Sequence, residues 1–118
     1  MVIQESGEMY LETILVLWQK KGDVRSVDVA NELGYTKAST SRAMSILKKE
    51  EYITIGEHGS IILTKKGLEK ATAIIDRHKV ISAFLVKTLN IDNELAGKDA
   101  CKIEHVISDE VYERMKEI

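Results

Sequence analysis

Apolar side chains recur at helical spacing near the start of the chain. They predict a helix over residues 5–21 with a core stripe at i, i+3, i+4 and i+7, formed by Leu11, Ile14, Leu15 and Trp18. Gly22 ends this helix. Met9 and Glu12 fall on its far side, so a thioether and a carboxylate share a second face. This face either binds a ligand or consists of a gap-filling Met beside a solvated Glu.

Two further helices joined by a turn are expected next. Ser26 is the predicted N-cap of a short helix that Gly34 closes, and Thr36 is the predicted N-cap of a helix over about residues 37–50. The predicted inner face of the latter is Ala43, Ile46 and Leu47. A short helix, a Gly-containing turn and a longer helix that opens with small polar and basic residues are typical of a helix-turn-helix.

The start of that third helix is the candidate DNA-reading segment. Its expected DNA-facing residues are Thr36, Lys37, Ala38, Ser39, Thr40 and Arg42. Such side chains can reach base edges and phosphates. The alternative is a polar helix face that is only solvated.

Residues 52–64 contain two β-rich runs around a Gly-containing turn, which predicts a hairpin. Directly behind a helix-turn-helix, such a hairpin is a wing. His58 and Ser60 lie at its expected tip, where they could contact the sugar-phosphate backbone. His58 alone is more often an exposed loop residue than a metal ligand.

The rest of the chain is predicted to be helical. Thr64 is expected to cap a helix over residues 65–89, whose apolar side holds Leu68, Ala71, Ile74, Ile75, Ile81, Leu85 and Leu89. His78 interrupts that side, as a core or interface His or as a ligand. A connection over residues 90–98 and a helix that contains Cys101 should follow. Ser108 should cap a last helix that turns inward Val111, Met115 and Ile118.

The predicted fold is therefore mostly α: a winged helix-turn-helix DNA-binding domain over residues 1–64 and a helical dimerisation domain over residues 65–118. The helices of the second domain carry more apolar surface than they can bury against one another. This excess favours a symmetric homodimer.

Cys101, Glu104 and His105 are candidate metal ligands. On a helix they stand at i, i+3 and i+4, where side chains are neighbours. Thiolate, carboxylate and imidazole together suit Fe(II), Mn(II), Co(II), Ni(II) or Zn(II) better than Mg(II) or Ca(II). The alternative is an inert buried Cys beside a solvated Glu-His pair.

Composition changes this picture in two ways. The chain has 118 residues, 44% of them hydrophobic and 31% charged, with no Pro, one Cys and no apolar run of the ~20 residues that a membrane span needs. With no secretion signal at its start, we expect a cytoplasmic protein. The net charge is −2, with seven Lys or Arg against nine Asp or Glu in residues 1–64 and ten against ten in residues 65–118. DNA binding would thus need a local basic patch, and bound cations would help.

Three rival functions remain open at this point. A winged-helix regulator without metal activation would bind DNA independently of metal. A thiol hydrolase could use Cys101 and His105, but the chain offers no oxyanion or substrate-pocket motif, so we expect no enzyme and no small-molecule substrate. A metal-storage protein would not need a helix-turn-helix.

Several segments together resemble the diphtheria toxin repressor family of metal-activated transcriptional repressors. They are Glu-Met-Tyr-Leu-Glu-Thr-Ile at residues 8–14, the winged helix-turn-helix, Arg-His-Lys at 77–79 and Asp-Ala-Cys-Lys-Ile-Glu-His-Val-Ile-Ser-Asp-Glu at 99–110. The likeness covers nearly the whole chain in unchanged order. It implies a repressor that binds operator DNA as a dimer when Fe(II) or Mn(II) is bound, in a two-domain form without the family's SH3-like domain.

The resemblance also implies a ligand set. The principal site of the iron-responsive branch matches Met9, Cys101, Glu104 and His105. His78 matches a ligand of both branches, and Glu12 matches one of the manganese branch, so the chain is a hybrid of the two.

Two departures put a second metal site in doubt. Ser82 and Gly97 replace an expected Glu and an expected His of the iron branch's second site. The sulfur ligands favour Fe(II) narrowly over Mn(II), with Co(II), Ni(II) or Zn(II) able to substitute in vitro.

Overall fold

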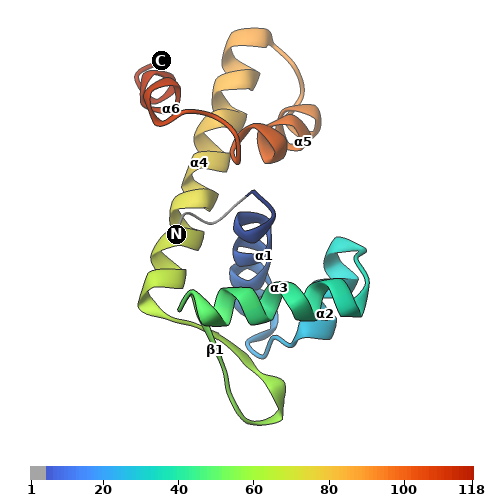
Figure 1. Cartoon of the computed structure of the whole chain (residues 1–118). Coiled ribbons are helices and arrows are strands. Elements are labelled where there is room, and N and C mark those ends of the chain that lie inside the picture. The colour runs from blue at the N-terminus through green and yellow to red at the C-terminus, as the bar shows by residue number, and fades with distance from the viewer. Residues whose placement is uncertain (1–4) are drawn as a thin grey trace. The chain divides into compact units, whose positions relative to one another are not determined.

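A computed structural model of the chain describes residues 5–118 (Figure 1). Contacts divide it into two compact units between Thr72 and Ala73. Helices dominate both units, and a two-stranded antiparallel sheet lies in the first. The predicted mostly α fold with a winged helix-turn-helix is confirmed.

The first unit opens with α1 (Glu5–Lys21), α2 (Ser26–Leu33) and α3 (Lys37–Lys49). The expected stop at Gly22 is confirmed: its φ is 82°, and its N–H donates to the Trp18 carbonyl at 2.8 Å. Gly34 closes α2 with a φ of 72°, a left-handed conformation that Gly adopts without steric cost.

The caps of α2 and α3 differ in how well they were predicted. Thr36 caps α3 as expected, because its hydroxyl accepts the Ser39 N–H at 3.1 Å. The prediction that Ser26 caps α2 is wrong. Arg25 is the N-cap, and its backbone N–H donates to the Asp28 carboxylate at 2.9 Å. The Asp28 side chain therefore reaches back over the first turn.

The core of the first unit corrects two predicted inner positions. Trp18 is 53% exposed and Ile46 is 50% exposed, so neither is a core residue. The inward face of α3 instead consists of Thr40, Met44 and Leu47, spaced at i, i+4 and i+7.

The hairpin forms as predicted, from β1 (Ile53–Ile55) and β2 (Ile61–Leu63) in antiparallel register. A short 3₁₀ turn, η1 (Glu57–Gly59), makes its tip. The Ile61 N–H also donates to the Val24 carbonyl at 2.7 Å, which ties the wing to the segment before α2.

α4 (Lys65–Leu89) begins directly after the wing and is packed against it. Thr64 caps it as predicted, because its hydroxyl accepts the Gly67 N–H at 3.0 Å. A Cβ at Gly67 would lie far inside van der Waals contact of the Tyr52 carbonyl oxygen. Only Gly therefore fits at this close approach of helix and wing.

The second unit contains the rest of α4, α5 (Asn93–Ile103) and α6 (Asp109–Lys116). Its buried core is formed by Ile81, Leu85, Ala96 and Ala100. The connection predicted over residues 90–98 is shorter, because Asp92 caps α5 and accepts the Leu95 N–H at 2.8 Å.

Four apolar side chains in and around α4 and α6 are exposed, and two of them, Val111 and Ile118, were predicted to face inward. They are Leu68 at 46%, Leu89 at 61%, Val111 at 47% and Ile118 at 62%. Ser108 caps α6 as predicted, accepting the Val111 N–H at 3.2 Å. Tyr112 and Met115 are the α6 side chains that pack on the core of the second unit.

Candidate metal centre and nucleic-acid interface

The candidate ligands of the second unit gather at the end of α5. Cys101 lies in the last turn of the helix, which ends at Ile103. Glu104 is its C-cap and His105 lies in the following turn, so the prediction of one helix under all three residues is corrected. Glu104 keeps helical φ and ψ, and its N–H donates to the Ala100 carbonyl at 2.9 Å. The ligand atoms of Cys101, Glu104 and His105 all lie within 4.8 Å of one another.

Glu104 is the centre of this cluster. Its side chain is buried, with the residue only 1% exposed. One carboxylate oxygen lies 2.9 Å from His78 Nδ1, and the other lies 3.2 Å from His105 Nε2. The structure thus brings His78 of α4 to the same carboxylate as His105. A carboxylate is costly to bury unless cations or hydrogen-bond donors compensate it.

The donor set fits a first-row transition metal. Sulfur, oxygen and imidazole nitrogen are offered side by side by Cys101, Glu104 and His105, with His78 in contact with Glu104. Hard cations such as Mg(II) prefer all-oxygen shells, whereas mixed sulfur and nitrogen donors suit Fe(II), Co(II), Ni(II) or Zn(II). The site can therefore hold such an ion through side chains of the second unit.

Arg77 binds the segment that follows His105, a contact that was not predicted from the sequence. Its guanidinium donates to the Ile107 carbonyl at 3.3 Å and to the Asp109 carboxylate at 2.8 Å. The same guanidinium lies 4.8 Å from the centroid of the Tyr112 ring. Arg77 precedes His78, so one turn of α4 both contacts Glu104 and holds the loop beyond His105. Nothing in the local sequence indicated these contacts, which span 30 and 32 positions of the chain.

Met9 and Glu12 lie on α1, in the first unit. Both are partly buried. The Tyr35 hydroxyl donates to the Met9 sulfur at 3.4 Å. No role of Tyr35 was predicted from the sequence.

The candidate DNA-reading residues divide into exposed and buried ones. Thr36, Lys37, Ala38, Ser39 and Arg42 are exposed around the start of α3. Thr40 was predicted to face DNA, but it is fully buried, because it lies on the inward face with Met44 and Leu47. We therefore leave Thr40 out of the interface.

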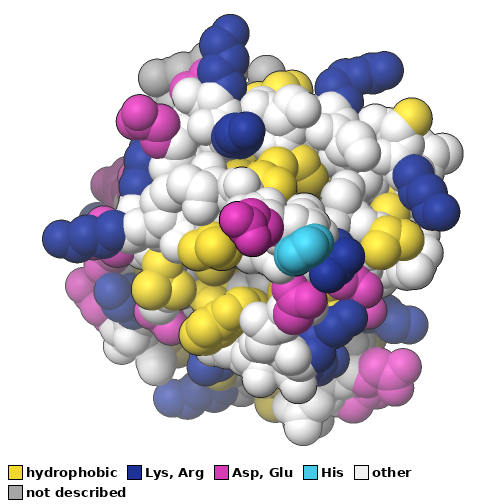
Figure 2. Space-filling model, turned by 90° about the horizontal axis from the view of Figure 1, so that it is seen from below, with side chains coloured by type: hydrophobic (Ala, Val, Ile, Leu, Met, Phe, Trp, Pro, Cys, Tyr) yellow, Lys and Arg dark blue, Asp and Glu magenta, His cyan; other side chains and the backbone are white. Residues whose placement is uncertain are grey.

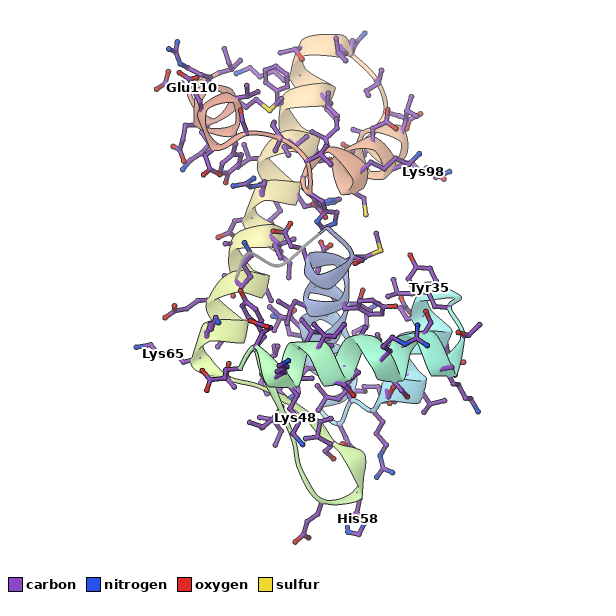
Figure 3. The ribbon with its side chains drawn as sticks, in the orientation of Figure 1. Tyr35, Lys48, His58, Lys65, Lys98 and Glu110 are labelled. Carbon is purple, nitrogen blue, oxygen red and sulfur yellow. The ribbon has the colours of Figure 1, made fainter. Side chains whose placement is uncertain are left out.

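The hairpin tip presents His58 to solvent, and Figure 3 shows it at the far end of the wing. His58 adopts a φ of 61° inside the 3₁₀ turn. Ser60 is only partly exposed, and its hydroxyl donates to the Asp23 carboxylate at 2.7 Å. A backbone phosphate would have to compete with Asp23 for that hydroxyl.

Charge on the wing end of the first unit is mixed. Figure 2 shows this face, on which Lys and Arg side chains stand apart, with Asp, Glu and hydrophobic side chains between them. The pattern agrees with the count of seven basic against nine acidic residues in residues 1–64. This face therefore carries no broad basic field among its described residues, and the exposed Lys37 and Arg42 are the candidate cations for a DNA backbone.

No helix among residues 5–118 combines the length and the apolar character that crossing a bilayer requires.

Comparison with known proteins decides the family. The family described as "Iron dependent repressor, N-terminal DNA binding domain" matches residues 3–59, and "Iron dependent repressor, metal binding and dimerisation domain" matches residues 64–118. An uncharacterised HTH-type transcriptional regulator of Methanocaldococcus jannaschii is 35% identical over 115 residues, which are 97% of this chain and 92% of that protein. The chain belongs to the diphtheria toxin repressor family. The resemblance drawn from its motifs is thereby confirmed.

Other members of this family of metal-dependent transcriptional repressors are similar over most of the chain. The HTH-type transcriptional regulator MntR of Bacillus subtilis is 31% identical over 103 residues, which are 87% of this chain and 72% of that protein. The solved structure of the manganese regulator SloR is 25% identical with a TM-score of 0.82 and covers 99% of this chain. IdeR of T. acidophilum gives the same identity, TM-score and coverage. The chain spans 54% of each of these two solved chains, about half of their length.

Proposed function

We propose that this diphtheria toxin repressor family member binds operator DNA as a homodimer when Fe(II), or alternatively Mn(II), is bound, and so controls genes of metal homeostasis. The observation that supports it best is the buried Glu104 carboxylate, held between His78 and His105 beside the Cys101 thiol. A purely structural core would rarely collect four such groups on one spot.

The proposed ligand set joins residues of both units. The cluster in the second unit supplies Cys101, Glu104 and His105, and α1 of the first unit supplies Met9. Support for Met9 comes from its thioether chemistry and from the family resemblance. Glu12 and His78 complete the set as further candidates, because each offers a donor that suits the same metals.

Sulfur donors lead us to Fe(II) narrowly ahead of Mn(II). Met9 and Cys101 are softer ligands than the carboxylates that Mn(II) favours. Co(II), Ni(II) and Zn(II) should bind at least as tightly in vitro, since affinity at such sites follows the Irving–Williams order. Availability in the cell, rather than affinity, would then select the metal.

A shared site would turn metal binding into a DNA-binding switch. When bound, the cation supplies positive charge and ligand bonds common to α1 and to the end of α5. Met9, Glu104 and His105 would together hold the cation, and such a shared ligand set would limit the motion of one unit against the other. A dimer must present its two reading heads at the ~34 Å repeat of successive major grooves. About 3 to 5 kcal/mol of differential metal affinity is enough to shift such a population by roughly 100-fold to several thousandfold.

The proposed DNA contacts follow the exposed side chains. Lys37, Ser39 and Arg42 at the start of α3 would read base edges and phosphates, flanked by Thr36 and Ala38 at the helix end. His58 and Ser60 on the wing would lie along the sugar-phosphate backbone. The exposure of the α3 residues supports this division, as does the N-cap at Thr36 that fixes the helix start.

Metal-resolved DNA binding tests the proposal. Duplexes selected from a random-sequence pool in the presence of Mn(II) would be titrated anaerobically, with chelator and then with Fe(II), Mn(II), Co(II) or Zn(II). We expect fluorescence anisotropy to show tight binding only with metal. Equal affinity in chelator and in metal would show a winged-helix regulator that metal does not activate.

A further inference from the structure

A hydrogen bond joins α1 to the turn of the helix-turn-helix. The Tyr35 hydroxyl donates to the Met9 sulfur across 3.4 Å, between residues 26 positions apart in the chain. Tyr35 is 45% exposed, and its ring meets the Tyr10 ring edge-on, with centroids 5.9 Å apart and an angle of 67° between the planes. Tyr10 is itself buried, at 6% exposure. Tyr35 thus contacts the Met9 sulfur with its hydroxyl and the buried Tyr10 ring with its own ring.

The backbone of Tyr35 lies where α2 ends and α3 is about to begin (Figure 3). It follows Gly34, the C-cap of α2, and its N–H donates to the Ala30 carbonyl at 3.0 Å. It precedes Thr36, the N-cap of the candidate reading helix. One residue thus connects a candidate metal ligand with the first residue of the DNA-reading segment.

We propose that Tyr35 is a positioning residue, which orients the Met9 thioether for metal binding and transmits the state of that ligand to the start of α3. This inference rests on the proposed function, since it takes the Met9 sulfur to be a ligand. It is specific to Tyr35, whose hydroxyl is the group that touches the sulfur.

The physical reason is the flexibility of methionine. A Met side chain has three rotatable bonds, and ordering it costs more conformational entropy than ordering most side chains. A thioether sulfur has two lone pairs, so one can accept the Tyr35 hydrogen bond while the other binds a metal. A sulfur already held by Tyr35 loses less freedom when it becomes a ligand. Partners that orient metal ligands raise affinity in this way.

The same contact works in the reverse direction. A Met9 side chain that holds a metal would have fewer rotamers, so it would hold the Tyr35 hydroxyl, and with it the residue before the α3 N-cap, more firmly. Coupling between two sites is reciprocal, so whatever Tyr35 contributes to metal binding must return as order at the α2–α3 turn.

A double-mutant cycle on the full chain tests the orienting role. The variants are Tyr35→Phe, which removes only the hydroxyl, Met9→Leu, which replaces the sulfur with a side chain of similar volume, and the pair together. Tyr52→Phe is the matched control, because Tyr52 is buried directly before β1 and its cation–π contact with Lys66 needs only its ring. Co(II) affinity is measured by anaerobic calorimetry without DNA.

We expect Tyr35→Phe to weaken Co(II) binding about two- to tenfold, the range of one net hydrogen bond. In the Met9→Leu background the same change should have no effect, and Tyr52→Phe should match the wild type. Unchanged Co(II) affinity in Tyr35→Phe would overturn the proposal. Equal losses in both backgrounds would do the same, because Tyr35 would then act on the fold and not through Met9.

Hydrogen exchange measured by mass spectrometry tests the transmission. Co(II) should slow exchange in a peptide covering residues 34–40 of the wild type, and Tyr35→Phe should remove much of that protection. Equal protection in both proteins would refute the link to α3. Neither measurement uses DNA. A wild-type protein that binds DNA without metal would therefore contradict the proposed function, while the Co(II) affinities of the double-mutant cycle could still be interpreted. Wild-type Co(II) affinity in Met9→Leu would sink the inference and leave the Glu104 cluster intact.

Discussion

Replacing Glu104 by Gln separates the two roles that a buried carboxylate can have. Gln has nearly the same shape, so Glu104→Gln leaves no cavity at a residue that is 1% exposed. Its amide can still accept one hydrogen bond and donate another toward the groups that now lie at 2.9 Å and 3.2 Å, His78 Nδ1 and His105 Nε2. What it loses is the negative charge and one anionic oxygen donor.

The structure gives the size of each effect. The variant exchanges the hydrogen bond with His78 for a neutral one, a loss of about 1 kcal/mol, but it also removes part of the penalty for burying a carboxylate. We therefore expect the free energy of unfolding without metal to change by less than about 1.5 kcal/mol. Metal affinity should fall at least about 100-fold, or about 2.7 kcal/mol. A residue that only hydrogen-bonds to a metal ligand usually contributes less than this.

Calorimetry with Mn(II) and Co(II), and urea unfolding in chelator, measure the two quantities. Glu113→Gln is the matched control, because Glu113 is exposed on α6, where it pairs with Lys116 at 3.4 Å. It should leave metal affinity unchanged. If Glu104→Gln binds both metals within about threefold of the wild type, the carboxylate is not a ligand. If the substitution instead lowers the free energy of unfolding in chelator by more than about 3 kcal/mol, Glu104 is chiefly structural.

Three further changes test other parts of the account. Arg42→Ala should weaken operator binding at least about fivefold, the effect expected for a lost base or phosphate contact. It should leave the Co(II) affinity measured by calorimetry unaltered. A parallel loss of Co(II) affinity would contradict the division between the DNA-reading helix and the metal centre. Gly67→Ala should destabilise the protein by roughly 2 kcal/mol or more in urea unfolding, because its Cβ would overlap the Tyr52 carbonyl, and a neutral result would refute that close approach. The Lys21 ammonium, through its hydrogen bond, holds the pKa of Asp28 below the ordinary Asp value. The stability that Asp28 contributes is therefore present above the unfolded-state pKa and is lost as pH falls through the lower folded-state pKa. An NMR titration of the Asp28 carboxyl should show this lowered pKa, and Lys21→Met should raise it again.

Local signals in the sequence were enough for most of the fold. Thr36, Thr64 and Ser108 were predicted as N-caps from residue type and position, and each accepts a backbone N–H at its helix start. Gly22 and Gly34 were predicted as helix ends, and both have positive φ. These features depend on a few adjacent residues, so the sequence alone specifies them.

Predictions that depended on which helix face turns inward were weaker. Trp18 and Ile46 are apolar at helical spacing, yet both are about half exposed. Ile46 lies one position before Leu47, and the inward face of α3 runs through Met44 and Leu47 instead. A hydrophobic pattern defines a face only to within about one residue, and the neighbouring helices decide the rest.

The candidate ligands could be predicted from the sequence, but the hydrogen bonds that position the segments around them could not. Cys101, Glu104 and His105 were expected on one helix, but α5 ends at Ile103, and the three stay adjacent because Glu104 keeps helical φ and ψ as the C-cap. Contacts that join distant segments left no local trace. The hydrogen bonds of Arg77 to the loop after His105 and of Tyr35 to Met9 are of this kind, since each spans 26 or more positions.

The central claim is that one divalent ion is held by side chains of α1 and by Cys101, Glu104 and His105 at the end of α5. Crystals grown anaerobically with Fe(II) or Mn(II), and measured on both sides of the metal absorption edge, test it most directly. The account predicts an anomalous peak bonded to Glu104 and His105 and also to Met9 or Glu12. A peak bonded to the second-unit residues alone, or no peak among them at saturating metal, would contradict it.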